Sequence, residues 1–271
     1  MNSKYKLLVT DIDGTIANKN GEISEIDLHT LRKIHKDGIM ISLCTGRAAG
    51  GCAKILDRLS MDGFHIFFDG ALVTDSTLSE EIYIKPIGSE LVRQICTLAS
   101  YNEITLELFS KAGFFIGSPN PLADIHGRLM SFYPTVVDFD AICTQQTIIL
   151  GCLVTPAHEE MRIMSLFREL EGRLRFISTF HPSRPDIRFI NITATGVTKG
   201  AALTALINYL GLNQENVIAI GDAANDIPLL SSAGLAIAMK NAPENLKNIA
   251  NYITEDVEHN GVAEAINKFF Y

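Results

Sequence analysis

The sequence predicts an α/β protein in which a parallel-sheet core is interrupted by an inserted α+β segment. Short apolar runs, typical of strands covered on both faces, alternate with helical periodicity towards both ends of the chain. Between Pro86 and about Asn191 the pattern changes to paired strands beside helices. We therefore expect a core made of residues 1–84 and 191–271, with residues 85–190 inserted into it.

The first strand is expected at residues 5–10, a run too short and too rich in β-forming residues for a helix. It ends in Asp11 and Asp13, which would lie at the mouth of a site because ligands bind beyond the carboxyl ends of parallel strands. One carboxylate can attack a phosphoryl group, and the other can pass a proton to the leaving oxygen. Mg²⁺ would screen the two charges. A helix N-cap at Asp13 and a calcium loop are the alternatives.

A second strand is expected at residues 39–44, after a helix at residues 26–36, so that the three elements form a βαβ unit. Thr45 and Gly46 follow this strand and precede a helical stretch that reaches Leu59. A hydroxyl group and free amides at such a turn can hold an anion. The alternative is that Thr45 only caps the helix.

The next segments continue the core and then build the insert. A third strand at residues 64–68 ends at Asp69. The insert is expected to contain two helices and five strands. The helices are at 89–101 and 158–170, and the strands are at 104–109, 114–117, 147–154, 174–178 and 187–192.

The core resumes with Thr198, a good N-cap for a helix at residues 201–210. Lys199 then lies at the helix start, where a cation opposes the helix dipole and needs a nearby anion or full solvation. An exposed surface lysine is the alternative.

A last apolar strand, at residues 217–220, leads into Gly-Asp-Ala-Ala-Asn-Asp at 221–226. Asp222 could complete a metal site, Asn225 could donate to a phosphoryl oxygen, and Asp226 could orient Lys199 or a metal-bound water. An isolated turn of this kind would usually be an Asx-turn that opens a helix. Several strand ends with complementary chemistry favour a site.

Composition narrows the possible functions. The net charge of −8 argues against a general nucleic-acid binder. Residues 85–190 carry ten basic and eleven acidic side chains, a balance of −1, so the remaining −7 lies in the core.

No apolar stretch is long enough for a membrane span, and the start of the chain leaves no room for a signal peptide, so we expect a cytoplasmic protein. The five cysteines and seven histidines indicate neither disulfides nor a zinc site.

Four motifs resemble those of the haloacid dehalogenase-superfamily phosphatases in order and rough spacing. They are Asp-Ile-Asp-Gly-Thr at 11–15, Thr-Gly-Arg at 45–47, Lys-Gly at 199–200 and Gly-Asp-Ala-Ala-Asn-Asp at 221–226. The segments at 238–242 and 261–263 are similar to the Cof-type subfamily. The resemblance implies a Rossmann-like core with a large inserted α/β cap that sets substrate specificity.

The resemblance also implies a role for each motif residue. Asp11 would be the nucleophile and a Mg²⁺ ligand. Asp13 would be the general acid and then the base, and would reach the metal through its backbone carbonyl. Asp222 would complete the Mg²⁺ ligands, and Asp226 would support these ligands without binding the metal itself. The phosphate-binding residues would be Thr45, Gly46, Lys199 and Asn225.

The expected function is a Mg²⁺-dependent phosphomonoesterase acting on small phosphorylated metabolites such as sugar phosphates. A sugar phosphomutase and a non-catalytic sugar-phosphate sensor are the alternatives. We expect no nucleic-acid or membrane partner, and a monomer or weak homo-oligomer. The chain has Asp69 where the family usually has asparagine and Lys240 where it often has glycine. Asp69 should point away, pair with a cap cation or touch a sugar hydroxyl, and Lys240 should face solvent.

Overall fold

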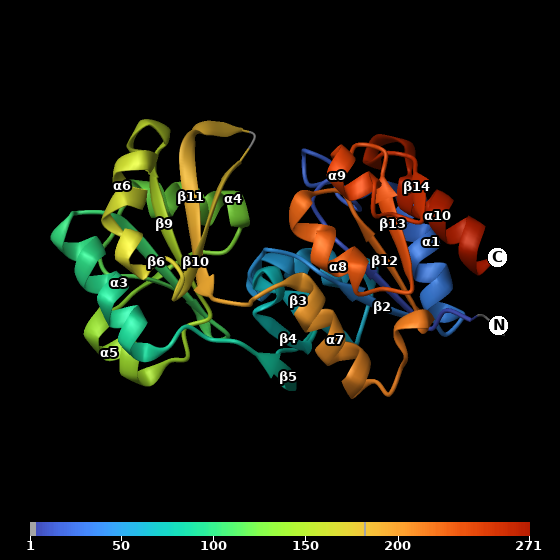
Figure 1. The fold of residues 1–271 in the computed structure, drawn as a ribbon, viewed down its shortest axis with the longest axis horizontal. Helices are drawn as coiled ribbons and strands as arrows, with labels where there is room; N and C mark the ends of the chain where they lie inside the picture. Colours follow the sequence, from blue (N-terminus) through green and yellow to red (C-terminus); the bar gives the residue numbers. More distant parts are fainter. Residues whose placement is uncertain (1–3, 182) are drawn as a thin grey trace. The chain divides into compact units, whose positions relative to one another are not determined.

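The computed structural model describes residues 4–181 and 183–271, which divide into two compact units (Figure 1). The core unit comprises the chain up to Arg47 together with residues 52–84 and 197–271. The inserted unit comprises residues 48–51 and 85–196. The return to the core therefore comes at Val197 and not at residue 191, because strand β11 (Arg184–Ala194) of the insert continues past that position.

The core unit is built on a five-stranded parallel sheet with the strand order β14-β13-β12-β1-β2. Its strands are β1 (Leu7–Thr10), β2 (Met40–Leu43), β12 (Val217–Gly221), β13 (Leu235–Met239) and β14 (Tyr252–Thr254). All four residues of the central strand β1 are buried, as expected for a strand covered on both faces. Because β1 lies between β12 and β2, the residues that follow these three strands meet at one edge.

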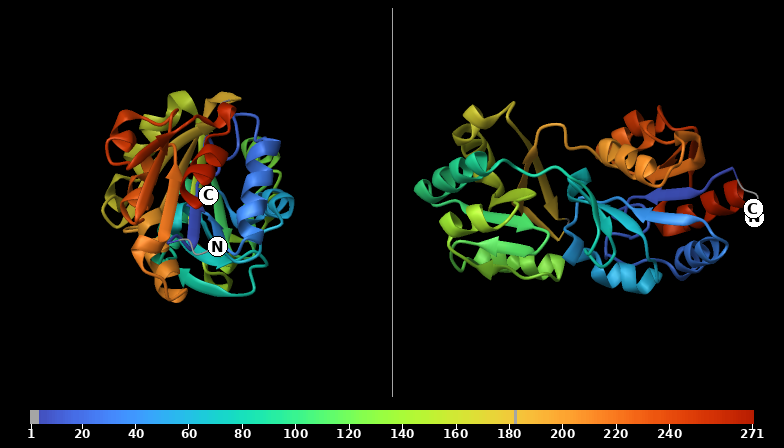
Figure 2. Two further views of the ribbon diagram at one scale, coloured as in Figure 1. Left: turned by 90° about the vertical axis from the view of Figure 1, so that its right-hand side faces the viewer. Right: turned by 90° about the horizontal axis from the view of Figure 1, so that it is seen from below.

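Helices cover both faces of this sheet (Figures 1 and 2). One face carries α1 (Glu25–Lys36) and α10 (Gly261–Phe270), and the other carries α7 (Lys199–Tyr209) and α8 (Ile227–Ser231). The remaining core helices are α2 (Ala53–Leu59) and α9 (Glu244–Lys247). Buried Asp27 of α1 accepts a hydrogen bond from the Ala263 amide at 2.7 Å, and so satisfies a free N–H in the first turn of α10.

The third strand leaves the parallel sheet. β3 (Phe64–Phe67) forms an antiparallel sheet with β4 (Leu72–Asp75), which pairs in turn with β5 (Glu81–Ile84). β3 reaches the parallel sheet through one bridge, in which the Thr45 amide donates to the Ile66 carbonyl at 2.9 Å. Two residues before Thr45, the Leu43 amide donates to Nδ1 of buried His65 at 3.1 Å. A side chain thus replaces a backbone acceptor between the two strands.

The inserted unit has a six-stranded sheet with the order β10-β11-β9-β6-β7-β8, antiparallel except between β7 and β8. The further strands are β6 (Thr105–Ser110), β7 (Gly113–Ile116), β8 (Thr135–Val136), β9 (Leu150–Pro156) and β10 (Leu174–His181). Three helices cover one face: α3 (Ser89–Tyr101), α5 (Phe139–Gln145) and α6 (Glu160–Leu166). Helix α4 (Pro121–Met130) lies on the opposite face (Figure 1). The helix expected at 158–170 is α6 flanked by two single 3₁₀ turns.

Two further observations bear on the expectations from composition. All five cysteines are buried thiols outside any disulfide. Within residues 4–181 and 183–271, no helix combines the length and the apolar character that crossing a membrane requires.

Candidate active site

A buried lysine lies at the centre of the site. Lys199 is the first residue of α7, behind the Thr198 cap, whose hydroxyl accepts from the Ala201 amide at 3.1 Å. The lysine side chain is 1% exposed, and its Nζ donates to Asp11 Oδ1 at 2.5 Å and Asp226 Oδ1 at 2.6 Å. Burial alone would lower the pKa of Lys199, but the two carboxylates raise it well above its ordinary value. The exposed-lysine alternative is therefore wrong.

Asp226 holds the lysine and the loop after β12 in place. Its side chain is fully buried, and Oδ1 accepts from Lys199. The other oxygen, Oδ2, accepts from the backbone amides of Asp222 and Ala223, both at 3.0 Å. Because both oxygens are engaged inside the protein, Asp226 can orient its neighbours but has little capacity left for a ligand.

Asp222 is held by two other segments of the core, the loop after β1 and the residue Asn241. Its Oδ1 accepts from the Thr15 hydroxyl at 3.0 Å, and its Oδ2 accepts from Asn241 Nδ2 at 3.2 Å. Asn241 also donates to the Gly14 carbonyl at 3.0 Å. Gly14 has φ +84°, and a Cβ atom there would lie 2.2 Å from Asp222 Oδ2, so only glycine fits.

Thr15 and Asn241 were not among the predicted site residues. Thr15 belongs to the first motif, and Asn241 follows β13, the next strand along the same sheet edge. Position after a strand was therefore the signal that could have identified Asn241.

The carboxylates of Asp11, Asp222 and Asp226 lie close together, with one oxygen from each within 4.8 Å of the others, and both oxygens of Asp226 are already engaged. Three carboxylates and Lys199 carry −3 + 1 = −2 when ionised. Burial, together with neighbouring carboxylates, raises the pKa of Asp11 well above its usual range and that of Asp222 to about 6. A divalent cation would offset this charge, and an all-oxygen donor set suits Mg²⁺.

The general-acid candidate is held by an arginine from the second motif. Arg47 Nε donates to Asp13 Oδ2 at 2.8 Å, and Nη2 of the same guanidinium donates to Oδ1. The Asp13 side chain is 56% exposed, whereas that of Asp11 is 9% exposed. The two acids of the first motif therefore differ in environment: one is buried against Lys199, and the other lies at the surface in a two-point contact with Arg47.

The remaining predicted phosphate ligands lie close to Asp69. Thr45 is buried, and its hydroxyl accepts from the Arg47 amide at 3.1 Å, two residues further on, so it does not cap a helix. A Cβ atom on Gly46 would lie 2.9 Å from the Asp69 carboxylate. Asn225 Nδ2 donates to Asp69 Oδ1 at 3.0 Å. Asp69 therefore pairs with Asn225, an arrangement that was not anticipated.

Lys240 is largely exposed, as expected, with 60% of its side chain accessible. Its Nζ pairs with Glu255 at 3.0 Å. The replacement of the family glycine thus adds a surface ion pair.

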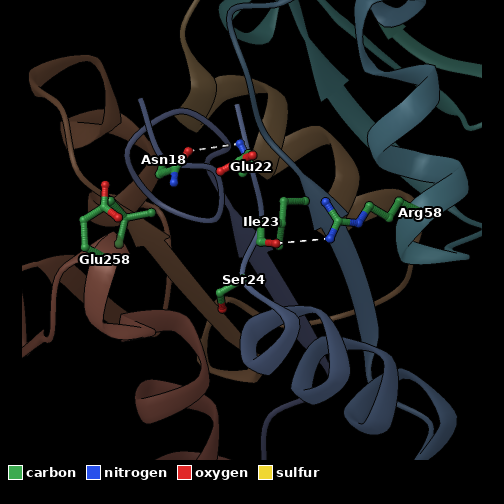
Figure 3. A pocket seen from close by; sticks show the side chains of 7 residues that line it. Asn18, Glu22, Ile23, Ser24, Arg58 and Glu258 are labelled. Atoms are coloured by element: carbon green, nitrogen blue, oxygen red, sulfur yellow. Dashed lines mark hydrogen bonds between the residues drawn. The ribbon is translucent and has the colours of Figure 1, made fainter. Parts of the chain in front are cut away.

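Two pockets lie outside this site. One, of about 240 Å³, is lined by residues that include Asn18, Glu22, Arg58 and Glu258 (Figure 3). Its polar groups largely bind one another: Asn18 Oδ1 accepts from the Glu22 amide at 3.1 Å, and Arg58 donates to the Ile23 carbonyl at 3.3 Å (Figure 3). The other, of about 260 Å³, lies where β1, β2 and β3 begin, away from the carboxyl ends of the strands. Neither contains a predicted site residue.

Comparison with known proteins agrees with this arrangement. A Bacillus subtilis protein named "Putative phosphatase YxeH" is 31% identical over 272 residues, which cover 97% of this chain and 98% of the relative. The 5-amino-6-(5-phospho-D-ribitylamino)uracil phosphatase YcsE of B. subtilis is 28% identical, over 96% of this chain and 94% of its own. The crystal structure of a haloacid dehalogenase-like hydrolase from Bacteroides thetaiotaomicron superposes with a TM-score of 0.87 at 29% identity, and the match covers 97% of this chain and 99% of that one.

The family model for haloacid dehalogenase-like hydrolases matches residues 8–266, nearly the whole chain. With the nucleophile candidate, the buried lysine and the acidic loop at one sheet edge, the protein belongs to the family of haloacid dehalogenase-like hydrolases.

Proposed function

We propose that this protein is a Mg²⁺-dependent phosphomonoesterase that hydrolyses small phosphorylated metabolites, such as sugar phosphates, through an aspartyl-phosphate on Asp11. The observation that carries the proposal is the position of Lys199, which is buried between Asp11 and Asp226 with Asp222 close by. The two relatives described above are both named as phosphatases, which supports the same reaction.

Asp11 is suited to act as the nucleophile. Its Oδ1 accepts from Lys199, whereas its Oδ2 makes no hydrogen bond within residues 4–181 and 183–271. In the first step Oδ2 forms a bond to phosphorus as the bond from phosphorus to the leaving alcohol oxygen breaks. Lys199 offsets negative charge on the transferring group, which is the main demand of a phosphoryl-transfer transition state.

Asp13 is suited to move protons because it lies at the surface, two residues from the nucleophile. It gives its proton to the leaving alcohol oxygen in the first step. In the second step it takes a proton from water as the water oxygen attacks phosphorus and the bond to Asp11 breaks, which releases inorganic phosphate. The two-point contact with Arg47 sets the orientation of the carboxyl group before substrate arrives.

The phosphate and metal ligands follow from the same geometry. The Thr45 hydroxyl accepts from the Arg47 amide, so its own proton is available for a phosphoryl oxygen, next to the Gly46 amide. The Asn225 amide has a second N–H beyond the one used by Asp69. Asp11, Asp222 and the backbone carbonyl of Asp13 would hold Mg²⁺, with Asp226 behind them. When bound, Mg²⁺ supplies positive charge that offsets repulsion between the carboxylates and the phosphate.

The substrate class rests on the relatives. The name of YcsE describes a phosphatase acting on a compound with a phosphorylated ribityl chain. At 28% identity over nearly the whole chain, this relative favours a phosphorylated polyol or sugar as the substrate of the present protein.

The test is phosphate release from a panel of sugar phosphates, polyol phosphates and nucleotides, with Mg²⁺ or with EDTA. We expect release only with Mg²⁺, none from Asp11→Asn, and normal release from the control Asp62→Asn, whose side chain is 94% exposed and remote from the motifs. Near-normal turnover by Asp11→Asn would refute the mechanism. Transfer of phosphate to another position of the sugar would indicate a mutase, and binding without turnover would indicate a sensor.

A further inference from the structure

A carboxylate, an imidazole and a thiol meet in the inserted unit, far in sequence from the core motifs. Glu107 of β6 lies directly opposite Cys152 of β9 in the antiparallel sheet. His126 comes from α4, the helix on the same face. One potential ligand atom of each residue lies within 4.8 Å of the other two, and Glu107 and Cys152 are fully buried.

The Glu107 carboxylate is only half satisfied. Its Oε2 bonds to His126 Nδ1 at 2.6 Å, whereas its Oε1 is buried and makes no hydrogen bond of standard geometry in the described part of the chain. The Cys152 thiol, a weak donor, is the second group that interacts with this carboxylate. Leaving a buried polar atom unsatisfied is destabilising, and more so when the group is charged. Because a thiol is only a weak donor, a cation bound between the carboxylate, the imidazole and the thiol would satisfy Glu107 better than Cys152 does.

The surroundings of the cluster are aromatic. The His126 ring lies 4.2 Å from the ring of Phe189, and it meets the rings of Phe109 and Phe114 edge-on at 6.4 and 6.1 Å. These rings keep water from most of the cluster. The His126 side chain is 14% exposed, so the imidazole is the side of the cluster that solvent and ions can reach.

We propose that Glu107, His126 and Cys152 form a binding site for a divalent transition metal, with Zn²⁺ as the best match. One oxygen, one nitrogen and one sulfur donor suit zinc and not Mg²⁺. Tetrahedral zinc with bonds of about 2.0–2.3 Å places its ligand atoms about 3.3–3.6 Å apart. The 2.6 Å contact between Glu107 and His126 is shorter than that spacing, so a bound metal would replace this hydrogen bond and move the two ligand atoms slightly apart. A fourth position would be left for water.

A metal ion would compete with protons for the three ligand atoms of the cluster. Burial raises the pKa of Glu107, an effect that the hydrogen bonds with His126 and Cys152 only partly offset. Burial and the neighbouring Glu107 also raise the pKa of the Cys152 thiol well above its usual range. Zinc would replace the protons held by these groups, so its affinity should fall as the pH is lowered.

Cobalt absorption tests the site on the full chain, because sulfur bound to Co²⁺ gives a charge-transfer band that carboxylates do not. The protein is titrated with Co²⁺ under a non-thiol reductant. We use the Asp222→Asn background, which weakens cobalt binding at the core carboxylates. We expect one equivalent to produce the sulfur band and visible tetrahedral bands, and Zn²⁺ to abolish both.

Matched variants assign the ligands. Cys152→Ser should lose the sulfur band, whereas Cys96→Ser, another buried thiol of the same unit, should keep it. His126→Gln keeps the thiol and should weaken cobalt binding at least about tenfold, which tests the site even if Cys152→Ser folds poorly. A saturated protein without a sulfur band, or a band and affinity unchanged in both Cys152→Ser and His126→Gln, would overturn the proposal.

Discussion

Lys199→Met should destabilise the core unit strongly. The substitution keeps an unbranched side chain of similar length but removes the cation between Asp11 and Asp226. At 4 Å and an effective dielectric constant of about 20, each charge pair is worth about 4 kcal/mol before desolvation is counted. The Asp11 and Asp226 side chains are 9% and 0% exposed, so water cannot replace the lysine. Removing one partner of a buried ion pair costs about 3–5 kcal/mol, and we expect a loss of that size.

The assay is urea denaturation followed by circular dichroism, in EDTA so that no metal substitutes for the lost charge. Lys240→Met is the matched control, because its ion pair with Glu255 is exposed and should contribute less than about 1 kcal/mol. Adding Asp11→Asn to Lys199→Met removes one uncompensated carboxylate and should restore about 1–3 kcal/mol. A loss for Lys199→Met as small as that of Lys240→Met would show that the buried charges are not coupled as described.

Two further predictions concern catalysis and pH. Arg47→Ala should lower kcat by about 10²-fold with little change in KM, because a misoriented Asp13 slows proton transfer. Steady-state kinetics with the best substrate would measure both constants. A rise in KM alone would instead indicate that Arg47 binds the substrate. Burial lowers the pKa of His65 to about 4, below the unfolded value of about 6.5, so its contribution to stability is lost as the pH falls from 6.5 towards 4. From pH 7 to pH 5, the free energy of unfolding of the wild type, measured by urea denaturation, should fall by about 2 kcal/mol more than that of His65→Asn. Equal falls in the two proteins would contradict this.

The position of the candidate site could be predicted from the sequence, because the residues that follow parallel strands all lie at the same edge of the sheet. The motifs after β1, β2 and β12 could therefore be grouped before any coordinates were known. The contact of Lys199 with Asp226 was among the possibilities. The full burial of Lys199 could not be predicted, since a lone lysine at a helix start is usually exposed.

Other features depended on side-chain geometry that no local pattern records. The departure of β3 from the parallel sheet involves buried His65, which occupies the acceptor position next to β2. The Asp69 carboxylate was expected to point away, pair with a cap cation or touch a sugar hydroxyl, and it pairs instead with the Asn225 amide. In both cases the partner comes from a separate element, so propensity and periodicity carry no information about the contact.

The position of β1 between β2 and β12 has a consequence for synthesis on the ribosome. β1 must wait for a neighbour that emerges about two hundred residues later, roughly 10–40 s at usual elongation rates of about 5–20 residues per second. The insert, whose sheet pairs only within residues 105–194, can fold during this delay. Until β12 emerges, the apolar strand β1 lacks one of its two partners, and Asp11 lacks both Lys199 and Asp222. Under the mechanism proposed above, the nascent chain is therefore catalytically silent until the acidic loop after β12 has been made.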